Sequence, residues 1–153
     1  MTDCRKVFLD TAPLIYLLDN DANYIQKIRL IFTELLEAGI TIVSSVITCE
    51  EYLVFPFRTN NREKIAAFCE FVSDCGIVLR NIDRETAEKA ARIRAEYPYF
   101  KGMDALQLAS ACLPGCDVML TNDNQLKQFQ EVRCITVDGW EPGFWSGGRQ
   151  IED

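Results

Sequence analysis

The chain has 153 residues, of which 48% are hydrophobic and 25% charged, a composition that is typical of one folded domain and excludes extensive disorder. No stretch approaches the roughly 20 consecutive apolar residues of a membrane helix, and we expect no signal peptide, and hence a cytoplasmic protein with no membrane partner. The sequence has no histidine, seven scattered cysteines and a net charge of −7, which exclude a Ser-His-Asp triad, disfavour zinc and argue against broad non-specific binding of nucleic acid.

The first half of the chain alternates between short apolar runs and amphipathic stretches. In order, it predicts a strand at residues 7–9, a first helical turn at 11–13, a helix at 22–38, a strand at 40–43, a helix from Thr48 limited by Pro56, and a helix at 63–75. Gly39 is expected to end the helix before it at the position that favours positive φ.

The same alternation continues through the second half. It predicts a strand at residues 77–79, a helix that Asp83 caps and that reaches Glu96, a helix that begins at Asp104 and ends before Pro114, a strand at 118–120, a short helix at 125–129 and a strand at 134–137. This βα alternation predicts the α/β class, with a parallel sheet flanked by helices.

The C-terminal stretch has a different composition, with Trp140, Phe144 and Trp145 among glycines. We expect the aromatic side chains to pack on the body of the domain and the final residues to fray. The chain is therefore divided into a domain of residues 1–138 and a C-terminal extension of residues 139–153.

Four isolated carboxylates stand where a predicted strand ends or a predicted helix begins: Asp10, Glu51, Asp104 and Asp123. In a parallel α/β sheet, ligands bind outside the carboxyl ends of the strands. Carboxylates converging there would repel one another unless a hard cation lay between them, and Mg²⁺ and Mn²⁺ prefer such oxygen ligands. The pattern therefore predicts metal-assisted phosphodiester chemistry.

Each acid also has a structural interpretation. Asp10 could cap the helix that follows it, Glu51 could close a capping box with Thr48, Asp104 could interact with its helix dipole, and Asp123 has the composition of a turn. Single positions therefore leave both interpretations open.

Four segments together resemble a known family: Phe8-Leu9-Asp10-Thr11, Ser45-Val46-Ile47-Thr48-x-x-Glu51, Asp104-Ala105-x-x-Leu108-Ala109 and Thr121-Asn122-Asp123. In this order and spacing they resemble the PIN-domain nucleases, most closely the VapC-like toxins of toxin–antitoxin pairs. The resemblance covers about residues 5 to 137.

The resemblance implies a three-layer α/β/α sandwich with a central, mainly parallel five-stranded sheet. It implies a Mg²⁺- or Mn²⁺-dependent endoribonuclease that acts on RNA, forms a homodimer and binds a cognate antitoxin. By motif it makes metal ligands and catalytic residues of Asp10, Glu51, Asp104 and Asp123, supported by Thr11, Thr121 and Asn122. Glu50, beside Glu51, and the C-terminal extension depart from the family pattern.

Two other functions remain open. A catalytically silent module of the same fold could bind RNA or protein with the acids acting as caps, and it should not bind Mn²⁺ at these acids. A phosphotransferase of the aspartyl-phosphate type also uses an acid after the first strand, but such sites place a second Asp two residues later, where this chain has Ala12.

The sequence gives only weaker indications of the residues that contact a substrate or a partner protein. Candidate cations and stacking groups for RNA are Arg58, Arg62, Lys101, Tyr97, Tyr99 and Phe100. Each could equally be a solvated or packed residue. The segment 55–57, Phe-Pro-Phe, is a candidate exposed apolar patch where an antitoxin could dock.

Overall fold

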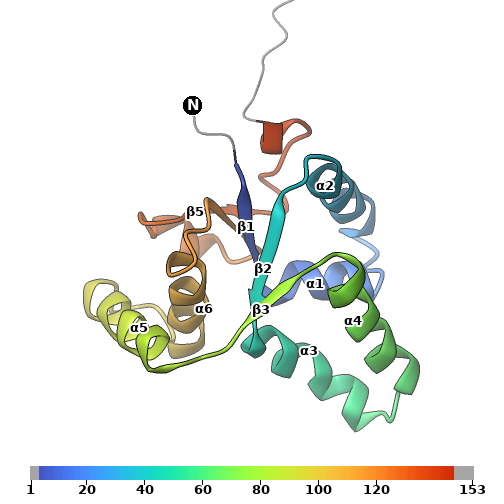
Figure 1. Cartoon of the computed structure of the whole chain (residues 1–153), viewed down its shortest axis with the longest axis horizontal. Coiled ribbons are helices and arrows are strands. Elements are labelled where there is room, and N and C mark those ends of the chain that lie inside the picture. Colours follow the sequence, from blue (N-terminus) through green and yellow to red (C-terminus); the bar gives the residue numbers. More distant parts are fainter. Residues whose placement is uncertain (1–3, 147–153) are drawn as a thin grey trace, which may run out of the picture.

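The central feature of the fold is a five-stranded parallel sheet, seen in a computed structural model that describes residues 4–146 (Figure 1). The strands lie in the order β3-β2-β1-β4-β5. Their bounds are β1 Lys6–Leu9, β2 Thr41–Ser45, β3 Val78–Arg80, β4 Val118–Thr121 and β5 Arg133–Thr136. This arrangement confirms the predicted α/β fold with a parallel sheet of five strands.

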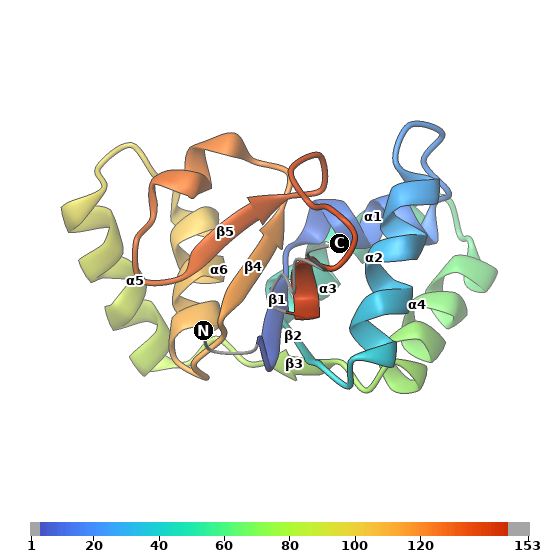
Figure 2. The ribbon, with the colours of Figure 1, turned by 90° about the horizontal axis from the view of Figure 1, so that it is seen from above.

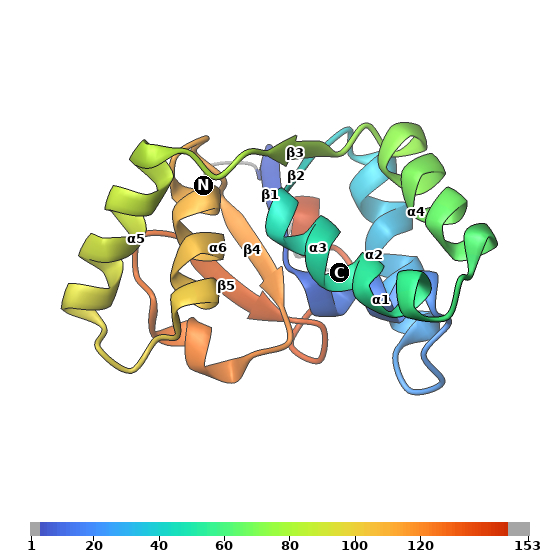
Figure 3. The same ribbon diagram turned by 90° about the horizontal axis from the view of Figure 1, so that it is seen from below.

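Helices cover both faces of the sheet, with α5 and α6 on one side and α2 and α4 on the other (Figures 2 and 3). The helix bounds are α1 Thr11–Leu18, α2 Ile25–Glu37, α3 Val46–Arg58, α4 Arg62–Asp74, α5 Arg84–Glu96 and α6 Gly102–Cys112, and the 3₁₀ turns are η1 Asn124–Gln128 and η2 Phe144–Ser146. Within residues 4–146, no helix has the length and apolar character needed to cross a bilayer.

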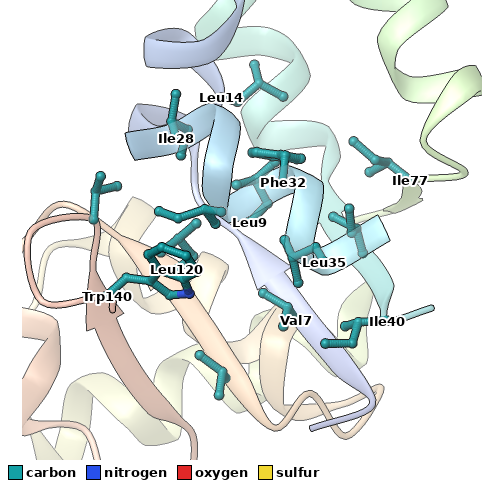
Figure 4. Close-up of a cluster of buried hydrophobic side chains, with 14 of the residues drawn as sticks. Val7, Leu9, Leu14, Ile28, Phe32, Leu35, Ile40, Ile77, Leu120 and Trp140 are labelled. Carbon is teal, nitrogen blue, oxygen red and sulfur yellow. The ribbon is translucent and has the colours of Figure 1, made fainter. Parts of the chain in front are cut away.

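Two separate hydrophobic cores fill the spaces between the layers, because successive strand residues point to opposite faces. Val7 and Leu9 of β1 pack into the core under α2 (Figure 4), whereas Phe8 between them packs against α5 and α6. Because β1 is buried on both faces of the sheet, its side chains are apolar at consecutive positions and do not alternate with polar ones.

Several predicted element bounds shift in the structure. The helix predicted from Thr48 begins at Val46, because the Ser45 hydroxyl caps it by accepting from the Ile47 amide at 3.1 Å. Pro56 does not limit this helix, which continues to Arg58. The predicted cap at Asp83 and the predicted end at Glu96 are confirmed.

The C-terminal residues 139–146 return over α2. Trp140 and Trp145 are buried, and the indole N–H of Trp145 donates to the Ile31 carbonyl at 3.2 Å. The Gly143 amide donates to Glu34 Oε1 at 3.1 Å. The expected fraying concerns residues that lie outside the described part of the chain.

Candidate active site

The site lies where the chain order of the strands reverses direction across the sheet. Chain order runs outward from β1 to β2 and β3, then returns to β4 on the other side of β1. The crevice between β1 and β4, at their carboxyl ends, is therefore the switch point at which open α/β sheets bind ligands. Asp10 follows β1 directly, and Asn122 and Asp123 follow β4.

Asp10 is both the N-cap of α1 and the most strongly held of the four acids. Its Oδ1 accepts from the Thr11 amide at 2.9 Å, and its Oδ2 accepts from the Thr121 hydroxyl at 2.8 Å. Burial nevertheless raises the pKa of the Asp10 carboxyl, and the charge of Glu51 adds to that rise. The predicted capping role is confirmed, and it leaves a desolvated carboxylate facing the crevice.

Thr11 joins the Asp10 segment to Glu51. Its hydroxyl donates to Glu51 Oε1 at 2.9 Å and lies 3.2 Å from the Thr48 hydroxyl. The alternative of a capping box between Thr48 and Glu51 is wrong, because Ser45 is the N-cap of α3 and Thr48 is buried inside the helix. Glu51 and Glu50 are both exposed, and only Glu51 is tied to the site by this hydrogen bond.

Asp104 lies in the first turn of α6, which begins at Gly102, two residues before the start predicted at Asp104. Lys101 occupies the N-cap without a side-chain bond, so Asp104 is not the cap. The carboxylate is half-buried, and its pKa is raised by burial first, then by the charges of Asp123 and Asp10, against a smaller opposing effect of Lys101. The carboxylates of Asp104, Asp10 and Asp123 therefore lie close enough for their charges to repel one another.

Thr121 links Asp10 to Asp123. Its hydroxyl, which donates to Asp10, accepts from the Asp123 amide at 3.1 Å. The Asp123 carboxylate caps η1 by accepting from the Gln125 amide at 2.9 Å. The turn interpretation of Asp123 is therefore correct, and this turn also holds Asp123 beside the Asp10 carboxylate.

Asn122 turns toward α1, where its amide donates to the Tyr16 hydroxyl. The Tyr16 ring stacks on that of Tyr24, with centroids 4.3 Å apart. Asn122 therefore connects the end of β4 with α1.

Gln107 is the main component of the site that the sequence analysis missed. It is only 2% exposed, on α6, and its Nε2 donates to Thr48 Oγ1 at 2.9 Å and to Asp10 Oδ1 at 3.4 Å. The Ser45 hydroxyl donates to its Oε1. The available signal was a long polar side chain one turn after Asp104, in a helix whose other buried residues are mostly apolar.

The crevice forms a cleft of about 510 Å³. Its lining residues are Asp10, Ala12, Thr121, Asn122, Asp123, Asn124 and Gln125. Asp104 and Glu51 stand outside this lining. Within residues 4–146, no three side chains of His, Cys, Asp or Glu lie close enough to hold one metal ion together.

The donor chemistry fits Mg²⁺ or Mn²⁺, although the acids do not form a closed cage. All candidate ligands are carboxylates, and the charges of Asp10 and Asp123 destabilise ionised Asp104, which a cation would relieve. Mg²⁺ usually keeps several waters and takes few protein ligands, so an open set of acids is compatible with it.

The candidate RNA-binding residues fall into two groups. Phe100 is a core residue, 3% exposed, whose ring stacks on Tyr97 with centroids 4.9 Å apart. Tyr99 is exposed, as are Arg58, Arg62 and Lys101. In the candidate apolar patch, Phe55 and Phe57 are each 61% exposed, whereas Pro56 between them is buried.

Comparisons with known proteins place this geometry in a family. The PIN domain model matches residues 7–132. Among solved structures, the chain is similar to VapBC2 from Rickettsia felis bound to a DNA fragment from their promoter, at 17% identity over 86% of this chain and 98% of that one, with a TM-score of 0.68.

Two further solved structures are similar at comparable levels. DNA-bound VapBC from Salmonella typhimurium has 20% identity, covers 87% of this chain and 98% of that one, and gives a TM-score of 0.68. Mycobacterium tuberculosis VapC20, a sarcin-ricin loop cleaving toxin, has 18% identity, 83% and 98% coverage and a TM-score of 0.60. No curated protein matches the sequence. Because the family model spans most of its length, this chain belongs to the PIN domain family.

Proposed function

We propose that this chain is a metal-dependent endoribonuclease and the toxin of a toxin–antitoxin pair. The observation that carries the proposal is the convergence of Asp10, Asp104 and Asp123 at the switch point of a PIN domain. The pKa of Asp104 is raised first by burial and then by the charges of Asp123 and Asp10, as expected for carboxylates that lie close together.

The proposed ligands of Mg²⁺ or Mn²⁺ are Asp10, Glu51, Asp104 and Asp123, partly through waters. When bound, the ion would supply Lewis acidity that lowers the pKa of a water and offsets negative charge on the phosphate oxygens. The protein's own contribution is orientation: Thr121 and the Thr11 amide hold Asp10, and the Thr11 hydroxyl holds Glu51. Hydrolysis of the P–O bond then needs no covalent enzyme intermediate, which suits a chain without histidine.

Cleavage of RNA tests the proposal directly. Purified protein is incubated with total cellular RNA in Mn²⁺, in Mg²⁺ and in EDTA, alongside Asp104→Asn and a control, Asp74→Asn, at an exposed acid on α4. We expect cleavage with either ion, none in EDTA, none with Asp104→Asn, and wild-type activity with Asp74→Asn. Cleavage by Asp104→Asn at the wild-type rate would remove Asp104 from the mechanism.

A cognate antitoxin and a homodimer are also proposed. Their support is that two of the similar structures are named as VapBC, and that Phe55 and Phe57 leave an apolar surface on α3. Sedimentation of the chain alone tests the homodimer, and pull-down after co-expression with its genomic neighbour tests the antitoxin. We also propose that the protein acts on RNA in the cytoplasm.

A second candidate function rests on a different observation, namely that no three described acids form a closed metal cage. In that case the chain is a catalytically silent PIN module that binds RNA or a protein. Mn²⁺ titration separates the two functions, because a silent module binds no Mn²⁺ at the acids. A nuclease binds Mn²⁺ there, and Asp104→Asn abolishes that binding.

A further inference from the structure

Gln107 is a buried polar side chain whose hydrogen bonds all lead to the candidate site. Its amide contacts Ser45, the N-cap of α3, and Thr48 within that helix. It also contacts Asp10 at the end of β1. A buried amide without partners would be costly, and a helix that packs between α5 and the sheet would be served equally well by an apolar residue. The placement therefore points to a role beyond packing.

We propose that Gln107 is a positioning residue that fixes the orientation of the Asp10 carboxylate for metal binding. The inference rests on the proposed function, since its consequence is the affinity of the site for a divalent ion.

The orientation of the Gln107 amide is determined by its neighbours. The Ser45 hydroxyl accepts from the Ile47 amide, so its single proton is directed to Gln107 Oε1. Nε2 is then turned toward Asp10, whose ionised carboxylate only accepts hydrogen bonds. The reversed amide would place Oε1 against the carboxylate, which is repulsive, so Ser45 and Asp10 select the same orientation.

The amide completes a clamp on both oxygens of Asp10. Thr121 donates to Oδ2, while the Thr11 amide and Gln107 donate to Oδ1. The carboxylate is thereby prevented from rotating about its Cβ–Cγ bond. Partners of this kind orient metal ligands, and their loss typically weakens metal binding.

The same amide is connected to a second acid through two hydroxyls. Nε2 donates to Thr48, Thr48 and Thr11 are hydrogen-bonded, and Thr11 donates to Glu51. A hydroxyl has one proton, so with Thr11 donating to Glu51 the bond between the threonines is donated by Thr48. Gln107 therefore stands at the start of a directed chain of donors that ends on Glu51.

The test measures Mn²⁺ affinity by titration calorimetry for wild type, Gln107→Met and Ser110→Ala. Methionine keeps the length of the side chain and removes its hydrogen bonds. Ser110 is the matched control, because it is a buried polar residue one turn further along α6. Among the described residues, its hydroxyl bonds only to the Leu106 carbonyl. We expect the Mn²⁺ dissociation constant to rise about tenfold with Gln107→Met and to stay within twofold of wild type with Ser110→Ala.

A double-mutant cycle shows whether Gln107 acts through Asp10. In an Asp10→Asn background, Gln107→Met should change the residual Mn²⁺ affinity by less than twofold. A full tenfold effect in that background, or an unchanged affinity in the single variant, would overturn the inference. Should Gln107→Met fail to fold in a urea-unfolding assay, Gln107→Asn takes its place, since it keeps the amide but is too short to reach both Ser45 and Asp10.

The two proposals fail in distinguishable ways. A wild-type chain that binds Mn²⁺ but cleaves no RNA contradicts the proposed function, and the affinity comparison still decides the role of Gln107. A wild-type chain that binds no Mn²⁺ overturns both. If RNA is cleaved, the Mn²⁺ concentration that gives half-maximal cleavage should rise with Gln107→Met. A smaller folded fraction alone would lower the apparent kcat without producing that rise.

Discussion

At the scale of single residues, the site combines acids that are hydrogen-bonded with acids that are electrostatically unfavourable. Asp10 accepts three hydrogen bonds, each of which lowers its pKa, yet desolvation is the larger effect and the net shift is upward. Asp104 accepts no such bonds from residues 4–146, and burial and then neighbouring charge raise its pKa. In the absence of a cation, ionised Asp104 therefore destabilises the folded protein.

Asp104→Asn should stabilise the metal-free protein at pH 7 while abolishing cleavage. The folded pKa of Asp104 lies above its ordinary value of 3.8, so the folded state holds the proton more tightly and stability is lost as pH rises through the folded pKa. The gain should be less than about 1 kcal/mol, because the group is only half-buried and is screened by solvent. Urea unfolding in EDTA should show this gain in the free energy of unfolding at pH 7, and no gain below pH 3.8. A less stable variant at pH 7 would contradict this account.

The sequence predicted the acids and, through the family motifs, their partners Thr11 and Thr121, but not Gln107. Asp10 and Asp123 could be found because each follows an apolar strand directly, and a parallel sheet brings such positions to one edge. The partners of Asp10 come from 97 and 111 residues further along the chain, Gln107 and Thr121 respectively. Only Thr121 lay inside a recognisable motif, whereas Gln107 depends on which face α6 turns to the sheet.

At the scale of elements, the start of α3 serves two purposes at once. Ser45 caps the helix through its oxygen and orients Gln107 through its proton. The helix start predicted from the sequence lies two residues later, at Thr48, where Thr48-x-x-Glu51 fits a capping box. Tertiary context decides where the strand ends, since Ser45 still pairs with Arg80 of β3.

Ser45→Ala should lower the free energy of unfolding by more than the loss of an ordinary helix cap does. Loss of the cap costs about 1 kcal/mol, and the unpaired Gln107 carbonyl adds about 1 to 3 kcal/mol. Asn61→Ala is the matched control, because Asn61 caps α4 through Lys64 and makes no other side-chain bond among the described residues. Urea unfolding should show that Asn61→Ala lowers the free energy of unfolding by about 1 kcal/mol. Equal costs for the two substitutions would contradict the double role of Ser45.

At the scale of the whole molecule, the core extends beyond the segment that the family model matches. The match ends at residue 132, yet Trp140 and Trp145 are buried against the face that carries α2. The aromatic pattern of the sequence indicated this packing, but not the layer that receives it, which depends on where the chain turns after β5.

Trp145→Ala should lower the free energy of unfolding by about 3 kcal/mol, since a buried indole is replaced by a cavity. It also removes the hydrogen bond to the Ile31 carbonyl. Phe57→Ala is the control, because the ring is 61% exposed, and its cost should stay within about 0.5 kcal/mol. Denaturant unfolding followed by circular dichroism measures both. A cost below about 1 kcal/mol for Trp145→Ala would show that the extension contributes little to the fold.

The position of these two indoles has an optical consequence. The chain has two tryptophans, and both lie in the segment 139–146. Intrinsic fluorescence therefore monitors the docking of one short segment, whereas far-ultraviolet circular dichroism monitors the six helices. Coincident unfolding curves would mean that the segment and the body melt as one cooperative unit, and an earlier fluorescence change would mean that the segment detaches first.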